Sequence, residues 1–546
     1  MPKIDRRQFC SYTAGLLLAA PALSGARAGR AGFEDSPFSP PPRATDVSDG
    51  YGIVGNGKTC NGKAINRLIE VVSQHGGGTL YFSAGDYLSR RTIHLKNNVH
   101  ICLGPGSTIT SGGPGEFDPS AISSDSDYHQ FEDFGHNHWR NSLIYGDDVE
   151  NVRIFGPGRI CGSGLSRDQW LMDDGTPPET APGVANKAIA FRKGRNIRLE
   201  DCEIVRDTGH FGILATGVQA LEMTNLLIDT ARDGVDIDCC TGVKLIGLSI
   251  NAPFDDGLVV KSSYALGRDG PNGCDNILVQ DCRIFGGYKV GTFRRDGTGE
   301  LLPPDRGRKG RFKIGSETDK PIANVRFIDC SCADGMGPLI TTVDGGNLTN
   351  VKIIGYRGTN IHNQAFFVFR GARLRAPLWI EERGPGALGN VEIRDFRSEG
   401  SSNRPAMVFG LSGYPVENFS LRDAVIVQGG GVLEDWSHVA LPEAAQEYPD
   451  TGMFGRKIPA SGIDARDVNG FDLANVVFAT RQPDLRPTVF LSNVERWTIR
   501  NVAGPRGSRA ELLHREQTPI SPAPASVSFS RPVNPSAASE WRVTPY

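Results

Sequence analysis

The sequence predicts an all-β fold, a single-stranded right-handed parallel β-helix with a helix capping its N-terminal end. A short frame repeats at intervals of 22 and 23 residues, with glycines at Gly212, Gly234 and Gly257. Repeats of this length, made of short β-type runs, are typical of a solenoid of stacked strands. The 67 glycines and 35 prolines supply the turns that many short strands need.

A second signature marks strands along most of the chain. An asparagine is followed by alternating apolar residues, which turns one set of side chains inward and the other outward. The signature begins at Asn151, Asn196, Asn276, Asn324, Asn350, Asn390 and Asn418. Its irregular spacing indicates that some coils carry long loops, and the charged, Gly- and Pro-rich segment 296–309 is one such insertion.

A helix is expected over residues 63–75. Ile65, Leu68, Ile69 and Val72 fall at helical spacing, and the three glycines at 76–78 stop the helix. A helix ahead of the first strand-like run would cover the open end of the core, where an exposed edge invites pairing with other chains.

The chain divides into four predicted parts. Residues 1–28 are typical of a twin-arginine export signal, with Arg6 and Arg7, an apolar stretch over residues 12–23 and a small-residue cleavage site at 26–28. Residues 29–45 are predicted to be a linker, residues 46–505 the β-helix, and residues 506–546 a tail along its outside. We therefore expect a periplasmic or secreted protein.

Bulk properties exclude other classes. The formal net charge is −3 and no basic run dominates a region, which argues against a nucleic-acid binder. No apolar run after residue 28 approaches the ~18 residues of a membrane helix. The 11 cysteines lack paired metal-ligand spacing, and Cys202, Cys282 and Cys330, which each follow an aspartate, are expected to be buried structural thiols. We expect a soluble monomer that needs no metal and no cofactor.

Three aspartates stand out because they occupy equivalent places in successive repeats: Asp233, Asp255 and Asp256. Neighbouring strands of a stack lie roughly 4.8 Å apart, so the three carboxylates would crowd one patch of surface. In regular strands Asp255 and Asp256 would face opposite ways and Asp233 would face the core. The three are therefore expected at the turn that leads into each strand, where residues 253–254 break the alternation.

Five segments carry a family resemblance: residues 49–58, 63–65, 76–87, 93–99 and 156–162. Together they resemble the family 28 glycoside hydrolases of the pectate-lyase superfamily, which include polygalacturonases and rhamnogalacturonan hydrolases. The similarity spans roughly residues 46–360. It implies a β-helix enzyme that acts on an acidic plant polysaccharide.

The same resemblance extends to the aspartates. Asp233-Gly234 matches the second half of the family's Asn-Thr-Asp-Gly motif, and Asp255-Asp256 matches its Gly-Asp-Asp motif. It implies that Asp255 is the general acid and that Asp233 and Asp256 position and deprotonate water in an inverting hydrolysis. Inverting enzymes hold their carboxyl groups roughly 6.5–9.5 Å apart to admit that water. Crowded like charges raise the pKa of one member, which keeps an acid protonated near neutrality.

Two departures indicate a divergent branch, such as a rhamnogalacturonan-type or exo-acting enzyme. The family's Gly-His-Gly motif is absent from residues 309–317. Arg311-Phe312-Lys313 resembles the family's Arg-Ile-Lys, which holds the substrate carboxylate, but it comes one coil early. Arg311 and Lys313 either bind an anionic sugar or neutralise the aspartates.

The other candidate substrate-binding residues are Lys261, His210, Arg232 and Arg370. His210 either replaces the missing histidine or is structural, and Arg370 lies on a cleft rim or is simply solvated. Asp236 and Asp238 are expected to form a solvated outer row, paired with Lys261.

The sequence thus predicts an exported glycoside hydrolase that cleaves a pectin-type polysaccharide or oligosaccharide. One alternative is a polysaccharide lyase, with Ca²⁺ on the carboxylates and Arg311 or Lys313 as the base. Another is a non-catalytic glycan-binding β-helix of the tailspike or adhesin type. An unsaturated product would identify the lyase, and binding without turnover would identify the glycan-binding protein.

Overall fold

The computed structural model describes residues 38–120, 138–166, 181–206, 209–267, 270–303, 306–375, 383–505, 513–516 and 528–529. The chain divides into a unit Met1–Ser39 and a unit Pro40–Tyr546, and the second contains all the helices and strands given below. The predicted export signal, residues 1–28, lies outside the described residues, as do most of the predicted linker and tail. These three assignments stay predictions.

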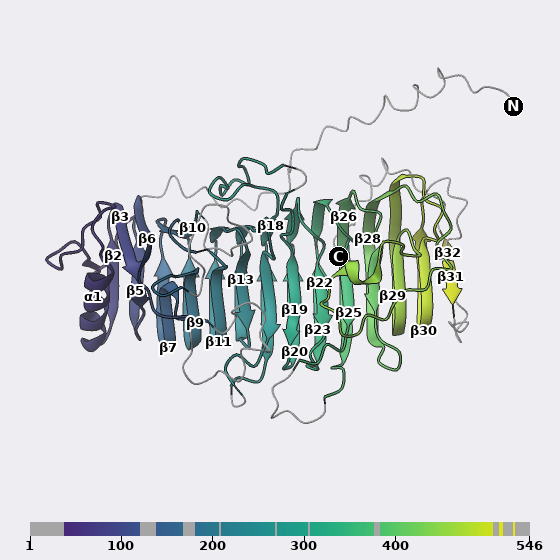
Figure 1. The fold of residues 1–546 in the computed structure, drawn as a ribbon, viewed down its shortest axis with the longest axis horizontal. Helices are drawn as coiled ribbons and strands as arrows, with labels where there is room; N and C mark the ends of the chain where they lie inside the picture. The colour runs from purple at the N-terminus through teal and green to yellow at the C-terminus, as the bar shows by residue number, and fades with distance from the viewer. Residues whose placement is uncertain are drawn as a thin grey trace, which may run out of the picture. The chain divides into compact units, whose positions relative to one another are not determined.

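The second unit is a right-handed parallel β-helix, as predicted, and its strands pair in parallel from coil to coil (Figure 1). They form three stacks. The first stack holds β4 (Ile93–His94), β7 (Ser142–Phe155), β9 (Lys187–Glu200), β11 (Phe211–Thr224), β13 (Asp233–Asp238), β16 (Leu258–Ser262), β19 (Phe312–Thr318), β22 (Leu339–Thr342), β25 (Phe367–Arg370), β27 (Ala406–Phe409), β29 (Ile463–Gln482), β30 (Val489–Ala503) and β31 (Leu513–Glu516).

The long strands β7, β9, β11, β29 and β30 bend and continue into the next stack. The second stack adds β1 (Thr45–Asp46), β2 (Gly78–Phe82), β5 (Val99–Leu103), β14 (Thr241–Ile246), β17 (Cys274–Gln280), β20 (Ile322–Ile328), β23 (Leu348–Ile354), β26 (Leu388–Gly400) and β28 (Val416–Gly430). The third stack adds β3 (Gly85–Arg91), β6 (Ser107–Glu116), β8 (Arg159–Cys161), β10 (Glu203–Val205), β12 (Leu227–Asp229), β15 (Ser249–Asn251), β18 (Arg283–Phe285), β21 (Ser331–Ala333), β24 (Arg357–Ile361) and β32 (Ser528–Phe529). Because β31 and β32 pair with β30, the parallel pairing continues into the segment predicted as a tail.

The predicted capping helix is confirmed as α1 (Gly62–Gln74), which lies beside β2 and β5 at the N-terminal end of the stack (Figure 1). Ile65, Leu68 and Ile69 are buried on the face that meets the core, and Val72 packs against it. The glycines that follow free the chain to turn, and Gly77 adopts a φ of 104°.

The asparagine that opens each predicted strand signature adopts a left-handed conformation, with φ between 54° and 58° at all seven positions. Asparagine tolerates this conformation better than other residues with a side chain. The side chains also stack. The Nδ2 atoms of Asn350, Asn390 and Asn418 each donate to the Oδ1 atom of the asparagine one coil earlier, at 3.1–3.3 Å. The ladder fixes the corner between the first and second stacks.

The interior is apolar and continuous from α1 to β30. All ten cysteines in the described part of the chain are free thiols, and only Cys60 is exposed. Burial raises the pKa of the Cys202 thiol to about 12, which keeps it neutral and unreactive. The structural interpretation of these cysteines is therefore confirmed. In the described residues, no helix is long and apolar enough to cross a membrane.

The outer side of the first stack is covered at both ends by apolar side chains. We call these the N-terminal cover and the C-terminal cover. The N-terminal cover consists of Trp139, Tyr145, Ala190, Phe211, Leu214 and Ala265. The C-terminal cover consists of Leu339, Val343, Phe367, Phe369, Met407, Phe409, Leu411, Phe454 and Ile458. Phe454 and Ile458 come from the loop between β28 and β29, which folds back over the stack.

Candidate active site

The three aspartates lie where the sequence predicts them, at the start of two adjacent strands of the first stack. Asp233 is the first residue of β13, and Asp255 and Asp256 immediately precede β16. Gly234 shows why the repeated frame needs glycine, since a Cβ there would lie 2.4 Å from the carbonyl oxygen of Gly257. The close approach of the two coils brings the three side chains together.

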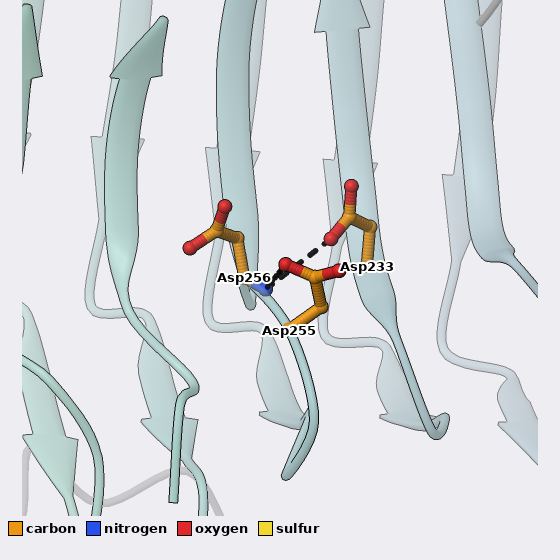
Figure 2. A group of neighbouring side chains, drawn as sticks. All are labelled: Asp233, Asp255 and Asp256. Carbon is orange, nitrogen blue, oxygen red and sulfur yellow. Dashed lines mark hydrogen bonds between the residues drawn. The ribbon is translucent and has the colours of Figure 1, made fainter. Parts of the chain in front are cut away.

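The three carboxyl groups form one compact cluster (Figure 2). One oxygen from each lies within 4.8 Å of the others. The backbone N–H of Asp256 donates to Asp233 Oδ1 at 3.2 Å and to Asp255 Oδ1 at 3.1 Å. Three atoms this close lie about 2.8 Å or less from a common point, which is hydrogen-bond distance for one water molecule. The 4.8 Å limit applies to the nearest oxygens, whereas the roughly 6.5–9.5 Å of other inverting enzymes is the separation of whole carboxyl groups.

Asp256 is the ionised member of the cluster. Its side chain is 3% exposed and accepts from Arg311 Nε at 2.5 Å and from Lys313 Nζ at 2.7 Å. Burial opposes ionisation, but the two positive charges outweigh it and hold the pKa of Asp256 well below its usual range. Of the two alternatives for Arg311 and Lys313, the contacts are those of charge neutralisation.

The pKa of Asp233 is shifted in the opposite direction. Burial raises its pKa well above the usual range, and the carboxylates of Asp255 and Asp236 raise it further. Asp255 accepts from Arg232 Nη2 at 2.9 Å and from Arg232 Nε at 3.1 Å. At 23% side-chain exposure, Asp255 is the most accessible of the three aspartates.

Lys261 lies behind the cluster rather than on a binding surface. Its Nζ is 2.6 Å from Asp236, 3.7 Å from Glu317 and 3.9 Å from Asp233. Burial disfavours its charge, but Asp236 and Glu317 outweigh that effect and raise the pKa of Lys261. The lysine is thus a buried counter-ion for three carboxyl groups.

The predicted pairing of Asp236 with Lys261 is confirmed, but the prediction of a solvated outer row is wrong. Asp236 and Asp238 are 0% and 1% exposed. The segment after β16 covers them, and Ser263 donates to Asp238 from its N–H at 2.8 Å and its hydroxyl at 2.6 Å. Outward direction in a strand does not mean exposure when a loop folds over the stack.

His210 and Arg370 have local structural contacts. His210 is buried, stacks on Phe211 with ring centroids 4.2 Å apart, and has Nδ1 3.5 Å from Arg232 Nη1. Through Arg232 it is linked to Asp255 of the cluster. Arg370 donates to the carbonyl oxygens of Pro415 at 2.7 Å and Pro385 at 3.2 Å, so it ties two loops together instead of lining a cleft rim.

Tyr448 is a site residue that the sequence did not reveal. It comes from the loop between β28 and β29, and its hydroxyl lies 3.0 Å from Lys313 Nζ. It remains 43% exposed. Arg373 also faces its ring, at 6.0 Å, while pairing with Asp344. The sequence around residue 448 has no pattern that indicates a site residue. Glu317, by contrast, lies at an outward position on the same strand as Lys313, so its place near the cluster could have been predicted from the alternation.

Three clustered carboxylates are also a common arrangement for a cation. Here Arg232, Arg311 and Lys313 already lie within hydrogen-bond distance of Asp255 or Asp256. A divalent ion would meet three fixed positive charges, so the cluster is better suited to proton transfer than to metal binding.

The sequence model of the family described as "Rhamnogalacturonase A/epimerase, pectate lyase-like" matches residues 44–253. Over 290 residues the chain is 24% identical to plasmin and fibronectin-binding protein A of Streptococcus pneumoniae. That match covers 50% of the chain and 33% of the streptococcal protein.

Two solved structures share the fold. A Thermotoga maritima exopolygalacturonase superposes with a TM-score of 0.52 at 19% identity, covering 71% of this chain and 88% of that enzyme. The Yersinia enterocolitica family 28 exopolygalacturonase gives a TM-score of 0.52 at 16% identity, covering 91% and 80%. The resemblance drawn from the sequence motifs is confirmed: the chain is similar to the pectate lyase-like family over residues 44–253 and shares the β-helix fold of these two exopolygalacturonases.

Proposed function

We propose that the protein is an exported glycoside hydrolase that cleaves an acidic, pectin-type polysaccharide or oligosaccharide with inversion. The observation that carries this proposal is the split in ionisation within one cluster, since Asp256 is held as a carboxylate while the pKa of Asp233 is raised. Hydrolysis with inversion needs both an acid and a carboxylate around one water. Export rests on the twin-arginine segment at residues 1–28.

Each of the three aspartates has a different role in the proposed reaction. The raised pKa of Asp233 favours its protonated form, so Asp233 is the proposed source of the proton in this cluster. Asp255, the most exposed, passes that proton to the leaving oxygen as the glycosidic C–O bond breaks. Asp256 accepts a hydrogen bond from the water that attacks the anomeric carbon. The proton that this water loses passes to the aspartates and replaces the one given to the leaving oxygen.

The contacts of Arg311 and Lys313 favour hydrolysis over lysis. A lyase needs a neutral base to remove a proton beside the uronate carboxyl group. Burial lowers the pKa of each residue, but the Asp256 carboxylate outweighs that effect and raises both values. Two permanently charged groups bound to a carboxylate do not serve as such a base.

Product analysis tests the proposal directly. The purified full-length protein is incubated with polygalacturonan, rhamnogalacturonan and pectin, with and without EDTA. We expect new reducing ends, an initial product of inverted anomeric configuration by NMR, no unsaturated uronate and no loss of rate in EDTA. Unsaturated products that require calcium would contradict the hydrolase and establish the lyase.

We further propose that the enzyme acts at chain ends. All residues of β13, β16, β19 and β22 are buried, and the N-terminal and C-terminal covers close the outer side of the stack on both sides of the aspartates. An internal stretch of polysaccharide needs an open binding groove that crosses several coils. A chain terminus needs only the accessible surface of Asp255 and Tyr448.

Viscometry checks this mode of action. At equal release of reducing ends, we expect the viscosity of polygalacturonan to fall much less with this protein than with an endo-acting polygalacturonase. Chromatography should show one short product from the first time point. An early ladder of mixed oligomers together with a steep loss of viscosity would contradict action at chain ends.

A second candidate is a non-catalytic glycan- or protein-binding β-helix. The similarity to plasmin and fibronectin-binding protein A over 290 residues favours it. Binding of the polysaccharide panel without any new reducing ends would support this candidate against the hydrolase.

A further inference from the structure

A cavity of about 890 Å³ lies away from the aspartates, between the third stack and the loop that follows β18. The strands β8, β10 and β12 form one side, and residues 291–300 form the other. Four arginines line it: Arg159, Arg206, Arg294 and Arg295. The volume is within the roughly 300–1,000 Å³ range typical of ligand sites.

The wall of this cavity is fixed to the β-helix. The N–H of Gly291 donates to Asp229 Oδ2 at 2.6 Å, and Arg295 donates to both the carbonyl and the side-chain oxygen of Asn225 at 2.9 Å. Within the loop, the Tyr288 hydroxyl donates to the Gly297 carbonyl at 2.6 Å. The cavity is therefore a built feature of the fold.

Part of its charge is satisfied within the protein. Arg159 donates to Glu203 at 2.8 Å, and Arg295 lies 3.8 Å from the same carboxylate. Glu300 pairs with Lys289 at 3.1 Å. These acidic groups are thus already occupied by basic partners.

Arg206 and Arg294 differ from the other two arginines. Both are exposed, and neither forms a salt bridge within the described residues, although the charge of Arg294 helps to lower the pKa of the exposed Asp296. The remaining acid, Asp229, is buried and accepts from Asn251 at 2.8 Å. Its burial raises its pKa to about 6, so it opposes an anionic ligand less than an ordinary carboxylate would. The cavity therefore presents two guanidinium groups that suit anionic groups on a ligand.

We propose that this cavity is a second binding site for an acidic oligosaccharide, in which Arg206 and Arg294 hold uronate carboxylates. The choice of a uronate rests on the proposed function. β12 ends at Asp229 in the cavity, and the chain reaches Asp233 in the cluster four residues later. An occupied cavity would therefore hold the acidic polymer beside the coils that carry the aspartates.

Calorimetric titration of the full-length Asp255→Asn protein with tetragalacturonate tests the proposal, since this variant is expected to bind without turnover. We expect two sites. The additional double change Arg206→Ala with Arg294→Ala should weaken one of them at least about tenfold, because charged hydrogen bonds of this kind are lost. The matched control is Arg195→Ala with Arg198→Ala, two exposed arginines of β9, and it should retain both sites.

The outcomes separate this inference from the proposed function. A single binding site in the Asp255→Asn protein would overturn the second site, even if hydrolysis is established. Two unchanged sites after Arg206→Ala with Arg294→Ala, at an unchanged melting temperature, would overturn it as well. Displacement of tetragalacturonate from this site by equimolar sulfate at constant ionic strength would overturn its assignment to a uronate. Two sites without hydrolysis in the wild-type protein would keep the inference and remove the proposed function.

Discussion

Replacing Asp255 with asparagine is expected to lower turnover of the acidic polysaccharide by about a thousandfold, within the range that general acid catalysis supplies. The amide keeps the shape of the side chain but has no acidic proton for the leaving oxygen. Because Asp255 is the most exposed aspartate of the cluster, the change should leave oligosaccharide affinity within about twofold. Initial rates of reducing-end release and calorimetric titration measure the two effects.

The matched control is Asp281→Asn, an exposed aspartate at the turn after β17 that makes no contact with the cluster in the described residues. It should retain both turnover and binding. Turnover by Asp255→Asn at more than about a tenth of the wild-type rate would contradict its role as the acid.

Replacing Lys261 with methionine is expected to destabilise the coils around the cluster by about 3–5 kcal/mol. The lysine lies 2.6 Å from Asp236 and within 4 Å of Glu317 and Asp233, so its loss removes a positive charge from beside three buried carboxyl groups. Hydrogen exchange followed by mass spectrometry suits a solenoid, which opens locally. Protection of β13, β16 and β19 should fall, while β29 and β30 should be unchanged.

The pH dependence of the Lys261 variant adds a second readout. Burial raises the pKa of Asp233 well above its usual range and the charge of Lys261 lowers it, so without the lysine this pKa rises further above its unfolded value and the folded state binds more protons. Stability is then present below the unfolded pKa and is lost as the pH rises. The defect should be smaller at about pH 5 than at about pH 8. Lys244→Met, an exposed lysine on β14, is the control, and an equal defect in both variants would contradict the buried counter-ion.

The sequence was sufficient to predict the elements whose position depends on local pattern. The helix at Gly62–Gln74 follows from apolar spacing and terminal glycines, and the asparagine signatures mark strands because each needs a left-handed corner. The aspartates could be placed at strand starts because, inside regular strands, the alternation of inward and outward positions would turn their side chains in different directions. Each of these inferences uses only residues within one coil or the next.

Burial of the outer row could not be predicted, because it depends on segments whose positions the repeat does not specify. Asp236 faces outward as expected, but residues 139 and 263–265 fold over that face. A periodic pattern distinguishes inward from outward positions. It does not tell which outward positions a loop covers.

The sequence did not decide whether Arg311 and Lys313 neutralise the aspartates, for a related reason. Lys313 pairs in register with Val259 of β16, but a long loop separates β18 from β19 and obscures the count of coils. Tyr448 arrives from a loop 135 residues beyond Lys313. Interactions across such distances follow from how loops fold back, for which the local sequence has no signal.

The asparagine ladder has an evolutionary consequence. It anchors one corner of successive coils, whereas the insertion after β18 and the loop between β28 and β29 leave from the opposite corner. Descendants of this chain can lengthen, shorten or exchange those loops without shifting the strands beneath them. The outer surface of the protein can therefore change by loop replacement while the stacked strands stay the same.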